Sequence, residues 1–394
     1  MTTKAGRECD VLVAGAGLPG LALAAALARQ GLSVTLADRA PVVAVSGDPA
    51  SWDTRVYAIS PGSVAFLRSI GAWQALPEAR LAPVEAMRIE GDRGAQLSFD
   101  AYDLAERALA WIVEERVLRA ALVDAVHAAG VEIVAPASFA SLSWTTTHGT
   151  LALDDGRSIA ARLVVGADGV RSWVRAAAGI VAEPRPYGQT AVVANFACEK
   201  PHRGVAHQWF LADGGVLAWL PLPGDRVSIV WSAPAALADT LASLEGEALA
   251  ARVADAGART LGTLTPITAA ATFPLAFLRL PAVIAHRLAL AGDAAHGIHP
   301  LAGQGVNLGF GDAQALAAVL AERGTIADPG APILLERYAR RRAAPVAAMQ
   351  AVTDGLVRLF GSALPGAAAL RNLGLAAVSK LPPLRQALAQ PALR

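Results

Sequence analysis

Two histidines, an aspartate and a proline lie close to a glycine-rich turn in residues 292–309, which read GDAAHGIHPLAGQGVNLG. Asp293, His296 and His299 carry side chains that can bind a metal ion. Glycines that lead into a helix can instead hold an anion on backbone N–H groups, and an aspartate before a helix can simply cap it. The spacing is compatible with a metal site, a nucleotide-binding turn or a plain helix start, and the rest of the chain decides among them.

A second glycine-rich stretch, GAGLPG, lies near the start of the chain at residues 15–20. It follows a predicted buried strand, Val11–Ala14, and leads into a predicted helix, Leu18–Gln30. The three glycines of a G-x-G-x-x-G pattern are Gly15, Gly17 and Gly20. Such glycines allow a tight turn, the approach of a pyrophosphate and close packing of helix on strand, so the pattern predicts a Rossmann-type dinucleotide site.

A carboxylate stands at the end of the next predicted strand, as that site requires. The strand Ser33–Ala37 ends at Asp38, within the spacing expected for an acid on a ribose hydroxyl. We therefore expect Leu18, at the start of the helix, to lie beside the dinucleotide, and Asp38 and its neighbour Arg39 to lie near the ribose.

Composition narrows the classes of protein that fit. The 394 residues are 54% hydrophobic and 17% charged, with a net charge of +1, which gives no general basic field for binding nucleic acid. Cys9 and Cys198 form neither a disulfide framework nor a C-x-x-C motif, which suits a reducing compartment. The uncharged run Val11–Ala28 is long enough to resemble a signal peptide or a marginal membrane span. Asp10 and the turn residues within the run favour a strand, a turn and a helix instead.

Two later stretches place an aspartate directly after a buried strand. Residues 163–174 read LVVGADGVRSWV and contain Asp168, and residues 288–293 read LALAGD and end at Asp293. Either aspartate alone is equally well explained as a helix cap. A carboxylate that points into a cleft can also accept hydrogen bonds from a sugar alcohol, and FAD has a ribityl chain where NAD has none.

Taken in this order, the motifs resemble the FAD-binding set of aromatic hydroxylases with the p-hydroxybenzoate hydroxylase fold. The stretches HPLAGQGVNLG at 299–309, WDTRVYAIS at 52–60 and TDGLVRLF at 353–360 are similar to one branch, the polyprenylphenol hydroxylases of ubiquinone biosynthesis. The stretch PLPGDRVSIVWS at 221–232 also fits this branch. The sequence departs from the family at Gly311, where an arginine usually precedes the aspartate that is Asp312 here.

The resemblance implies that a flavin lies at the glycine-rich turn of residues 292–309. Asp293 would hold the ribityl chain, Pro300 would lie along the ring, and the helix start after it would face the ring with backbone amides. The implied residues of that helix start are Gly303, Gln304, Gly305 and Asn307. Arg55 would reach the adenosine and phosphate side. Arg116 matches a polar position of the family near the cofactor, but a salt bridge at a helix start explains it equally well. His296 and His299 would then orient the loop, and no metal is expected.

The resemblance also implies the reaction. FAD would be bound tightly but not covalently, NAD(P)H would visit transiently to reduce it, and O2 would add at C4a to give the hydroperoxide that hydroxylates the ring. No second G-x-G-x-x-G follows a strand and no redox C-x-x-C exists, so a resident nicotinamide is not expected. No triad or carboxylate pair is recognisable, and the catalytic residues therefore stay unassigned.

The sequence predicts an α/β fold in which a Rossmann-type FAD-binding domain is interleaved with an antiparallel-sheet substrate domain. Short β-rich segments separated by turn residues follow residue 181, and a hairpin is expected at Val84–Phe99. Asp239–Ala256 is predicted to be one helix. The expected division is residues 1–75, 101–180 and 276–360 for the FAD-binding domain, 76–100 and 181–275 for the substrate domain, and 361–394 for a C-terminal helical tail.

We expect the substrate to be a polyprenylated phenol and the location to be cytoplasmic, with peripheral attachment to the inner face of the cytoplasmic membrane. Basic residues outnumber acidic ones after residue 331, which suits an anionic membrane surface, and other quinone-biosynthesis enzymes are possible partners. Val346, Met349, Val352, Leu356 and Leu359 form an apolar helical face, which the sequence assigns to packing on the protein; residues 373–393 are the better membrane candidate. The alternatives are a hydroxylase of a small soluble aromatic or natural product, and a flavin-binding scaffold subunit with little turnover.

Overall fold

The computed structural model describes residues 7–44, 48, 50–324, 328–361, 371, 372 and 393. Its first sheet has eight strands, in the order β18-β19-β11-β1-β2-β8, with β10 beside β11 and β9 beside β10. Five of them, from β19 to β8, run parallel. The strands of this sheet are β1 (Arg7–Ala14), β2 (Val34–Ala37), β8 (Glu132–Val134), β9 (Phe139–Trp144), β10 (Gly149–Leu153), β11 (Ser158–Gly166), β18 (Ile284–Ala285) and β19 (Leu288–Leu290).

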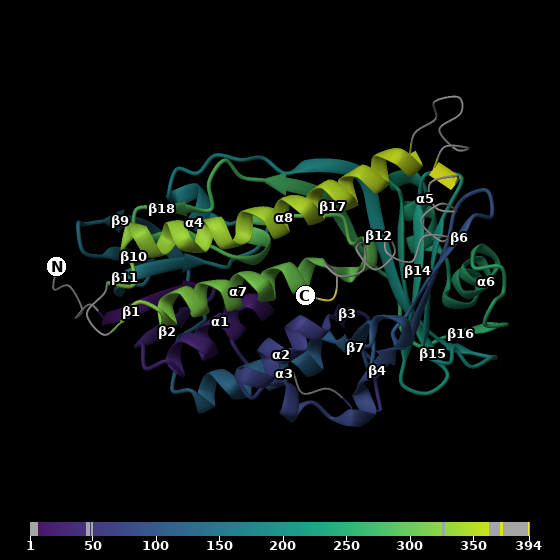
Figure 1. Ribbon diagram of the computed structural model, residues 1–394, viewed down its shortest axis with the longest axis horizontal. Coiled ribbons are helices and arrows are strands. Elements are labelled where there is room, and N and C mark those ends of the chain that lie inside the picture. Colours follow the sequence, from purple (N-terminus) through teal and green to yellow (C-terminus); the bar gives the residue numbers. More distant parts are fainter. Residues whose placement is uncertain are drawn as a thin grey trace.

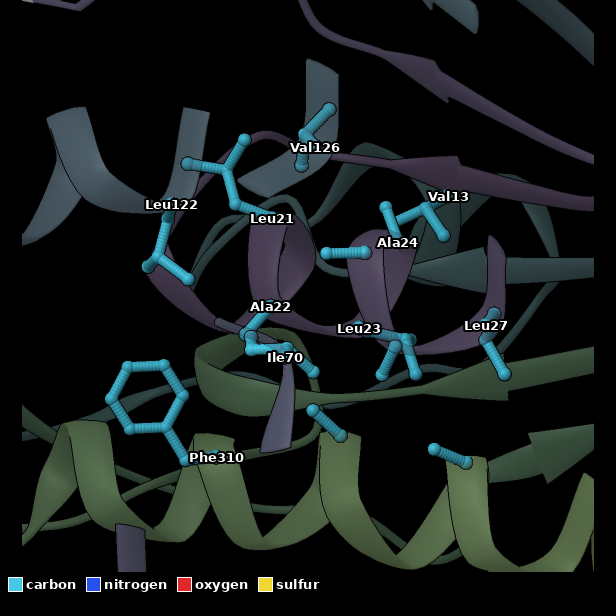
Figure 2. Close-up of a cluster of buried hydrophobic side chains, with 14 of the residues drawn as sticks. Val13, Leu21, Ala22, Leu23, Ala24, Leu27, Ile70, Leu122, Val126 and Phe310 are labelled. Carbon is cyan, nitrogen blue, oxygen red and sulfur yellow. The ribbon is translucent and has the colours of Figure 1, made fainter. Parts of the chain in front are cut away.

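The predicted strand, turn, helix and strand at the start of the chain are confirmed as β1, α1 (Leu18–Ala28) and β2. Helix α1 is buried on nearly every side, because the parallel sheet covers one face and two helices cover the other. Figure 2 shows its side chains between Leu122 and Val126 on one side and Phe310 on the other. The uncharged run Val11–Ala28 is therefore apolar because it forms the core of this layer.

A second sheet has nine strands, in the order β20-β17-β12-β15-β14-β13-β5-β6, with β16 beside β12. All its pairs are antiparallel except β13 with β5. The hairpin expected at Val84–Phe99 is present as β5 and β6. The strands are β5 (Ala86–Glu90), β6 (Gln96–Asp100), β12 (Arg185–Cys198), β13 (Val205–Phe210), β14 (Val216–Leu222), β15 (Arg226–Pro234), β16 (Leu264–Pro266), β17 (Ala271–Arg279) and β20 (His296–Gly297).

A small sheet, β3-β7-β4, lies between these two layers (Figure 1). The third sheet consists of β3 (Val56–Ile59), β4 (Ala82–Val84) and β7 (Ala110–Glu114). The remaining helices are α2 (Pro61–Ser69), α3 (Glu115–Ala128), α4 (Trp173–Ala177), α5 (Ala235–Ser243), α6 (Gly246–Ala256), α7 (Gly305–Ala321) and α8 (Pro332–Gly361). Helix α8 runs along the long axis of the molecule, from the first sheet to the second (Figure 1).

One expected helix is wrong. The segment 239–256 is not continuous, because the chain is extended at Leu244 and Glu245 between α5 and α6. Both helices cover the outer face of the second sheet, where Trp209, Trp219 and Trp231 lie buried in one cluster. These tryptophans therefore belong to the core of this layer.

Candidate active site

The turn between β1 and α1 is closed by glycines, as the motif predicted. Gly15 has φ +114°, and a Cβ on it would lie 2.3 Å from the carbonyl oxygen of Ala167. A Cβ on Gly20 would lie 2.0 Å from the carbonyl oxygen of Gly15. Gly17 differs, because the nearest atom to its Cβ position would be 4.0 Å away. Gly15 and Gly20 thus pack the helix against the strand, and Gly17 leaves space.

That space is part of a large cavity of about 1490 Å³, which runs between the first and the second sheet. Gly15, Gly17 and Leu18 line one end of it. The other predicted cofactor residues along its wall are Asp38, Arg39, Arg55, Asp168, Asp293, Pro300, Gly303, Gln304 and Gly305. The structure therefore gathers at one cavity motifs that lie as much as 290 residues apart in the chain.

Asp38 fixes the backbone of the glycine turn. Its Oδ2 accepts a hydrogen bond from the Ala16 N–H at 2.5 Å, and its Oδ1 accepts one from the Ala40 N–H at 2.7 Å. Arg119 donates to the carbonyl oxygen of Ala16 at 2.7 Å from the opposite side. Arg39 lies over the ring of Phe139, 5.6 Å from its centroid. The turn is held in shape before any ligand binds.

The two predicted arginines have different places. Arg55 lines the cavity, where its Nη1 contacts Glu115 Oε2 at 2.9 Å and its guanidinium lies 4.4 Å from the Phe273 ring centroid. Arg116 does not line the cavity. Its guanidinium donates to Ser51 and pairs with Glu114 at 3.2 Å. Of the two explanations open for Arg116, the salt bridge at a helix start describes what the structure contains.

Asp168 both lines the cavity and ties the loop after β11. Its Oδ2 accepts a hydrogen bond from the Val174 N–H at 3.0 Å, and its Oδ1 accepts one from the Ser172 hydroxyl. Ser172 in turn accepts from the Arg175 N–H at the start of α4. The capping role and the cavity position therefore coexist in one carboxylate.

Asp293 lines the cavity, and its side chain is exposed to that space. Burial raises the pKa of this carboxyl, and nearby His296 and Arg55 only partly oppose the shift. The backbone before it is fixed by the fully buried Asp312, whose Oδ2 accepts from the Gly292 N–H at 2.8 Å. Gly292 has φ +60°, which a glycine adopts without strain.

Asp312 is the centre of a buried charge network that the sequence did not reveal. Its carboxylate contacts His296 Nε2 and Arg342 Nε, each at 2.6 Å. A Cβ on Gly311 would lie 3.0 Å from both terminal nitrogens of Arg342. Burial by itself would raise the pKa of Asp312, but His296 and Arg342 outweigh it and hold the pKa below the ordinary value. Gly311 thus leaves room for an arginine that comes from α8.

His299 is buried completely and connects the loop to the second sheet. Its Nε2 is 2.9 Å from Oε1 of Gln189 on β12, and the ring of Tyr187 meets it edge-on at 5.1 Å. Burial lowers the pKa of His299 to about 4. With His296 bonded to Asp312, the two histidines do not converge, and no group of three or more metal-ligating side chains occurs among residues the structure describes.

Asn307 is turned away from the cavity wall. Its Nδ2 donates to the carbonyl oxygen of Ala58 at 2.8 Å, and its Oδ1 accepts from the Ser60 N–H at 3.0 Å. It therefore holds the start of α7 against β3. Gly305, at the same helix start, lines the cavity, and a Cβ on it would find no atom within 4 Å.

The far half of the cavity was missed by reasoning from the sequence. One of its walls is the inner face of the second sheet, and the other is α8. The wall residues of the sheet include Met87, Ile89, Leu97, Phe99, Ala206, Gln208, Phe210, Ala218 and Leu220. Those of α8 include Met349, Val352, Leu356 and Leu359. Strand alternation indicates which side chains share a face, but not which face meets a cavity.

Comparison with known proteins gives consistent matches over nearly the whole chain. A family model described as FAD binding domain matches residues 8–353. The ubiquinone hydroxylase UbiL of Rhodospirillum rubrum is 38% identical over 392 residues, which cover 98% of this chain and 90% of UbiL. The 3-demethoxyubiquinol 3-hydroxylase of Escherichia coli is 37% identical over 385 residues, covering 96% of this chain and 97% of that enzyme. The crystal structure of PqsL, a probable FAD-dependent monooxygenase from Pseudomonas aeruginosa, has a TM-score of 0.78 at 26% identity and covers 94% and 99% of the two chains.

Proposed function

The chain belongs to the FAD-binding-domain family of flavoprotein hydroxylases, and from this membership we propose its reaction. It is an FAD-dependent monooxygenase that uses NAD(P)H and O2 to hydroxylate the aromatic ring of a polyprenylated phenol in ubiquinone biosynthesis. The family and its ubiquinone hydroxylases support the cofactor and the reaction class. The cavity supports the substrate class.

The residues at the nucleotide end of the cavity fit FAD. Gly17 and Gly305 leave open space along the wall where side chains would project. We propose that Asp38 and Arg55 lie on the adenosine side, and that Asp293 accepts hydrogen bonds from the ribityl hydroxyls. The start of α7, at Gly305, would direct backbone N–H groups at the flavin ring. When bound, FAD supplies the redox chemistry, taking a hydride from NAD(P)H and activating O2.

A continuous apolar space beyond the flavin end is the observation that carries the substrate assignment. The cavity continues between the second sheet and α8, with Met87, Phe210 and Leu220 on one side and Val352 and Leu356 on the other. A small phenol leaves most of such a space empty, whereas an isoprenoid chain fills it. Burying apolar chain surface is worth about 25 cal/mol per Å², so the tail supplies binding energy that the ring alone lacks.

The protein's own contribution is binding, orientation and exclusion of water. His299 is neutral above a pH of about 4, and its Nε2 is committed to Gln189, so it holds the loop in place. Asp312 likewise holds the loop through Gly292 and His296, and Asp293 is assigned to the ribityl hydroxyls. Enclosing the reacting ring between the sheet, the loop and α8 keeps water away from the reaction.

The direct test is substrate-stimulated oxidation of NAD(P)H by the purified holoenzyme. A phenol with a prenyl tail should accelerate oxidation and give a product heavier by one oxygen atom. Mass spectrometry of cells that lack the protein should show a prenylated quinone precursor that accumulates. Absence of both effects would contradict the proposal. Absence of stimulated oxidation with every phenol would favour the scaffold alternative.

A smaller aromatic substrate is the second candidate, supported by the likeness to PqsL. A structure of PqsL was determined in complex with 2-aminobenzoylacetate, a compact aromatic acid. Comparing kcat/KM for one phenol with and without a tail separates the two candidates. A preference for the tailless compound would favour the second.

We also propose that the protein attaches peripherally to an anionic membrane surface, because a polyprenylated phenol resides in the bilayer. No helix within the part of the chain that the structure describes is both long and apolar enough to cross a membrane. Nearly all of the membrane candidate 373–393 lies outside the described residues. The basic residues of α8 give less support than expected, because Arg342 is bonded to Asp312, and Arg341 and Arg358 pair with Glu322 and Asp354.

Flotation with anionic liposomes tests the membrane proposal. The full chain should float at low salt and less at high salt, because electrostatic attraction is screened. Truncation after Leu373 should weaken flotation while FAD is retained. No flotation of the full chain at low salt would contradict attachment.

The division into two domains is likewise a proposal. Its support is that strands of the second sheet lie at 86–100 and 185–279, while the parallel sheet takes its strands from the rest of the chain. Strand β17 extends past the boundary at 275. Strand β20 pairs with it and belongs to residues 292–304, the segment between β19 and α7 that we call the flavin loop. The expected tail, 361–394, falls almost entirely outside the described residues.

A further inference from the structure

A polar side chain on the second sheet lies in the largely apolar half of the cavity. Gln208, on β13, is only 4% exposed and lines the cavity. Its carboxamide makes no hydrogen bond to another described residue. Burying an amide without hydrogen bonds costs free energy of folding. An amide of this kind that faces a cavity therefore indicates a ligand that supplies the missing hydrogen bonds.

The register of the second sheet shows that Gln208 points into the cavity. It pairs with Ala218 on β14 and with Ile89 on β5, and Ala218 pairs with Val230 on β15. All three partners line the cavity, and residues at one register position point to the same face. The alternate residues, such as Trp209, pack under α5 and α6 on the other face.

The neighbours of Gln208 in this row are apolar and leave room for a ligand. Ala218, beside it, has a side chain of one methyl group. None of these neighbours can accept or donate a hydrogen bond through its side chain. The amide is therefore the polar group of this row, between Ile89 and Val230.

The position of Gln208 is also close to the predicted site of reaction. Phe210, two residues along the same face, packs against Leu301 of the flavin loop and against Phe360 of α8. The rings of Phe210 and Phe360 are stacked with centroids 3.7 Å apart. The row that contains Gln208 thus lies next to the point where the sheet, the flavin loop and α8 meet.

From these observations we propose that Gln208 binds an oxygen substituent of the aromatic ring of the substrate. The inference rests on the proposed function and names a residue that determines specificity. A carboxamide offers an N–H₂ donor and a carbonyl acceptor, which match a phenol hydroxyl. Its apolar neighbours would contact the ring and the first part of the tail.

The test compares two probes, a phenol with a short prenyl chain and the O-methyl ether of that phenol. The ether lacks the hydrogen that the Gln208 carbonyl would accept. Binding is measured from the change in flavin absorbance of the holoenzyme. The wild type should bind the phenol about five- to tenfold more tightly than the ether, as expected for one hydrogen bond.

Gln208→Leu should reduce this ratio to near one by weakening the phenol while leaving the ether unchanged. The FAD content should be that of the wild type, because Gln208 lies in the half of the cavity away from the glycine turn. Gln96→Leu is the matched control, since Gln96 is exposed on β6, two strands from β13 in the same sheet, and it should keep the wild-type ratio. The Tm of Gln208→Leu should be equal to or above that of the wild type, because a buried polar group is removed.

The outcomes separate this inference from the proposed function. A wild-type protein that neither binds nor hydroxylates the phenol would contradict the proposed function itself. A Gln208→Leu protein that still prefers the phenol to the same degree would overturn only the role of Gln208. A Tm several degrees below that of the wild type would show that the amide supports the fold, and would overturn the inference too.

Discussion

At the scale of single residues, Asp312 determines the geometry of the flavin loop. It is buried between His296, Arg342 and the Gly292 N–H, and Gly292 leads directly into Asp293. A buried carboxylate of this kind is stable only while its positive partners remain. The glycine at position 311, which departs from the family pattern, is explained by the Arg342 guanidinium that occupies the adjacent space.

Replacing Arg342 with Met should therefore destabilise the protein by about 3 kcal/mol, since it leaves a buried charge with one partner fewer. Urea unfolding measures this loss. Arg341→Met is the control, because Arg341 pairs with Glu322 on the surface and should change stability by at most about 1 kcal/mol. Equal effects of the two substitutions would contradict the role of Arg342.

The same network predicts a dependence on pH. The pKa of Asp312 is lowered in the folded protein, so the unfolded chain binds a proton more readily. Asp312 therefore contributes stability that is fully present above the unfolded value of about 3.9 and is lost as pH falls further. In Arg342→Met this contribution should be smaller and its loss should end at a higher pH, because without Arg342 the pKa of Asp312 is lowered less.

Asp293→Ala should lower the FAD content of the purified protein, because the ribityl hydrogen bonds are lost. Bonds to a charged group are worth about 1.5–3 kcal/mol, which corresponds to roughly ten- to a hundredfold weaker binding. The ratio of flavin to protein absorbance measures the effect, with exposed Asp239→Ala as the control. Full FAD occupancy in Asp293→Ala would refute the assignment.

Part of the candidate site could be predicted from the sequence, because glycines in a turn and acids at the ends of strands are recognisable from their spacing. Gly15, Asp38 and Asp293 all line the cavity as expected. Arg116 and Asn307 do not, since polar side chains next to a site bind backbone groups as readily as ligands. Gln208 was missed because one polar residue in a strand carries no local signal without the register of its neighbours.

At the scale of elements, α8 has a second role besides covering the sheets. The sequence predicted an apolar face on it but assigned that face to packing on the protein. In the structure Met349, Val352, Leu356 and Leu359 line the cavity, and Val352 is 48% exposed. The helical period identifies an apolar face, but it does not distinguish a wall of a cavity from a packed interface.

Val352→Asp should therefore impair the use of substrates with long tails. A carboxylate in the apolar half of the cavity disfavours an isoprenoid chain, so KM for the tailed phenol should rise at least about tenfold. The KM for the tailless phenol should change little. Ile333→Asp serves as the control, because Ile333 is an exposed residue near the start of the same helix. Equal changes of KM for both substrates would contradict a tail site along α8.

The break between α5 and α6 shows a second limit of reading elements from sequence. Residues 239–256 have the composition of a single helix, yet the chain turns at Leu244 and Glu245. The two shorter helices follow the curved outer face of the second sheet, where buried tryptophans form the core. Tertiary packing decided the break, and helix propensity is too weak to override it.

At the scale of the whole molecule, a few polar contacts join the flavin loop and the segment before β3 to the second sheet. His299 reaches Gln189 on β12, and Asn195, also on β12, donates to the carbonyl oxygen of Asp53 at 2.7 Å. The cavity lies between these layers, so its width depends on the contacts. A substrate bound on the second sheet, as proposed, would thereby be held at a fixed distance from the loop.

His299 should make this junction sensitive to acid. Burial lowers its pKa to about 4 in the folded protein, against 6.5 when unfolded, so the unfolded state takes up the proton first. The stability that depends on a neutral His299 is therefore present above a pH of about 6.5 and lost as pH falls toward 4, by up to about 3 kcal/mol. His299→Gln cannot be protonated, so its stability should fall less between pH 6.5 and 4, and its loop should keep a bond to β12. Urea unfolding of both proteins across this range measures the difference, with exposed His127→Gln as the control. If His299→Gln lost stability over this range as steeply as the wild type, His299 would not be the group that titrates, and the junction would have to depend on other contacts.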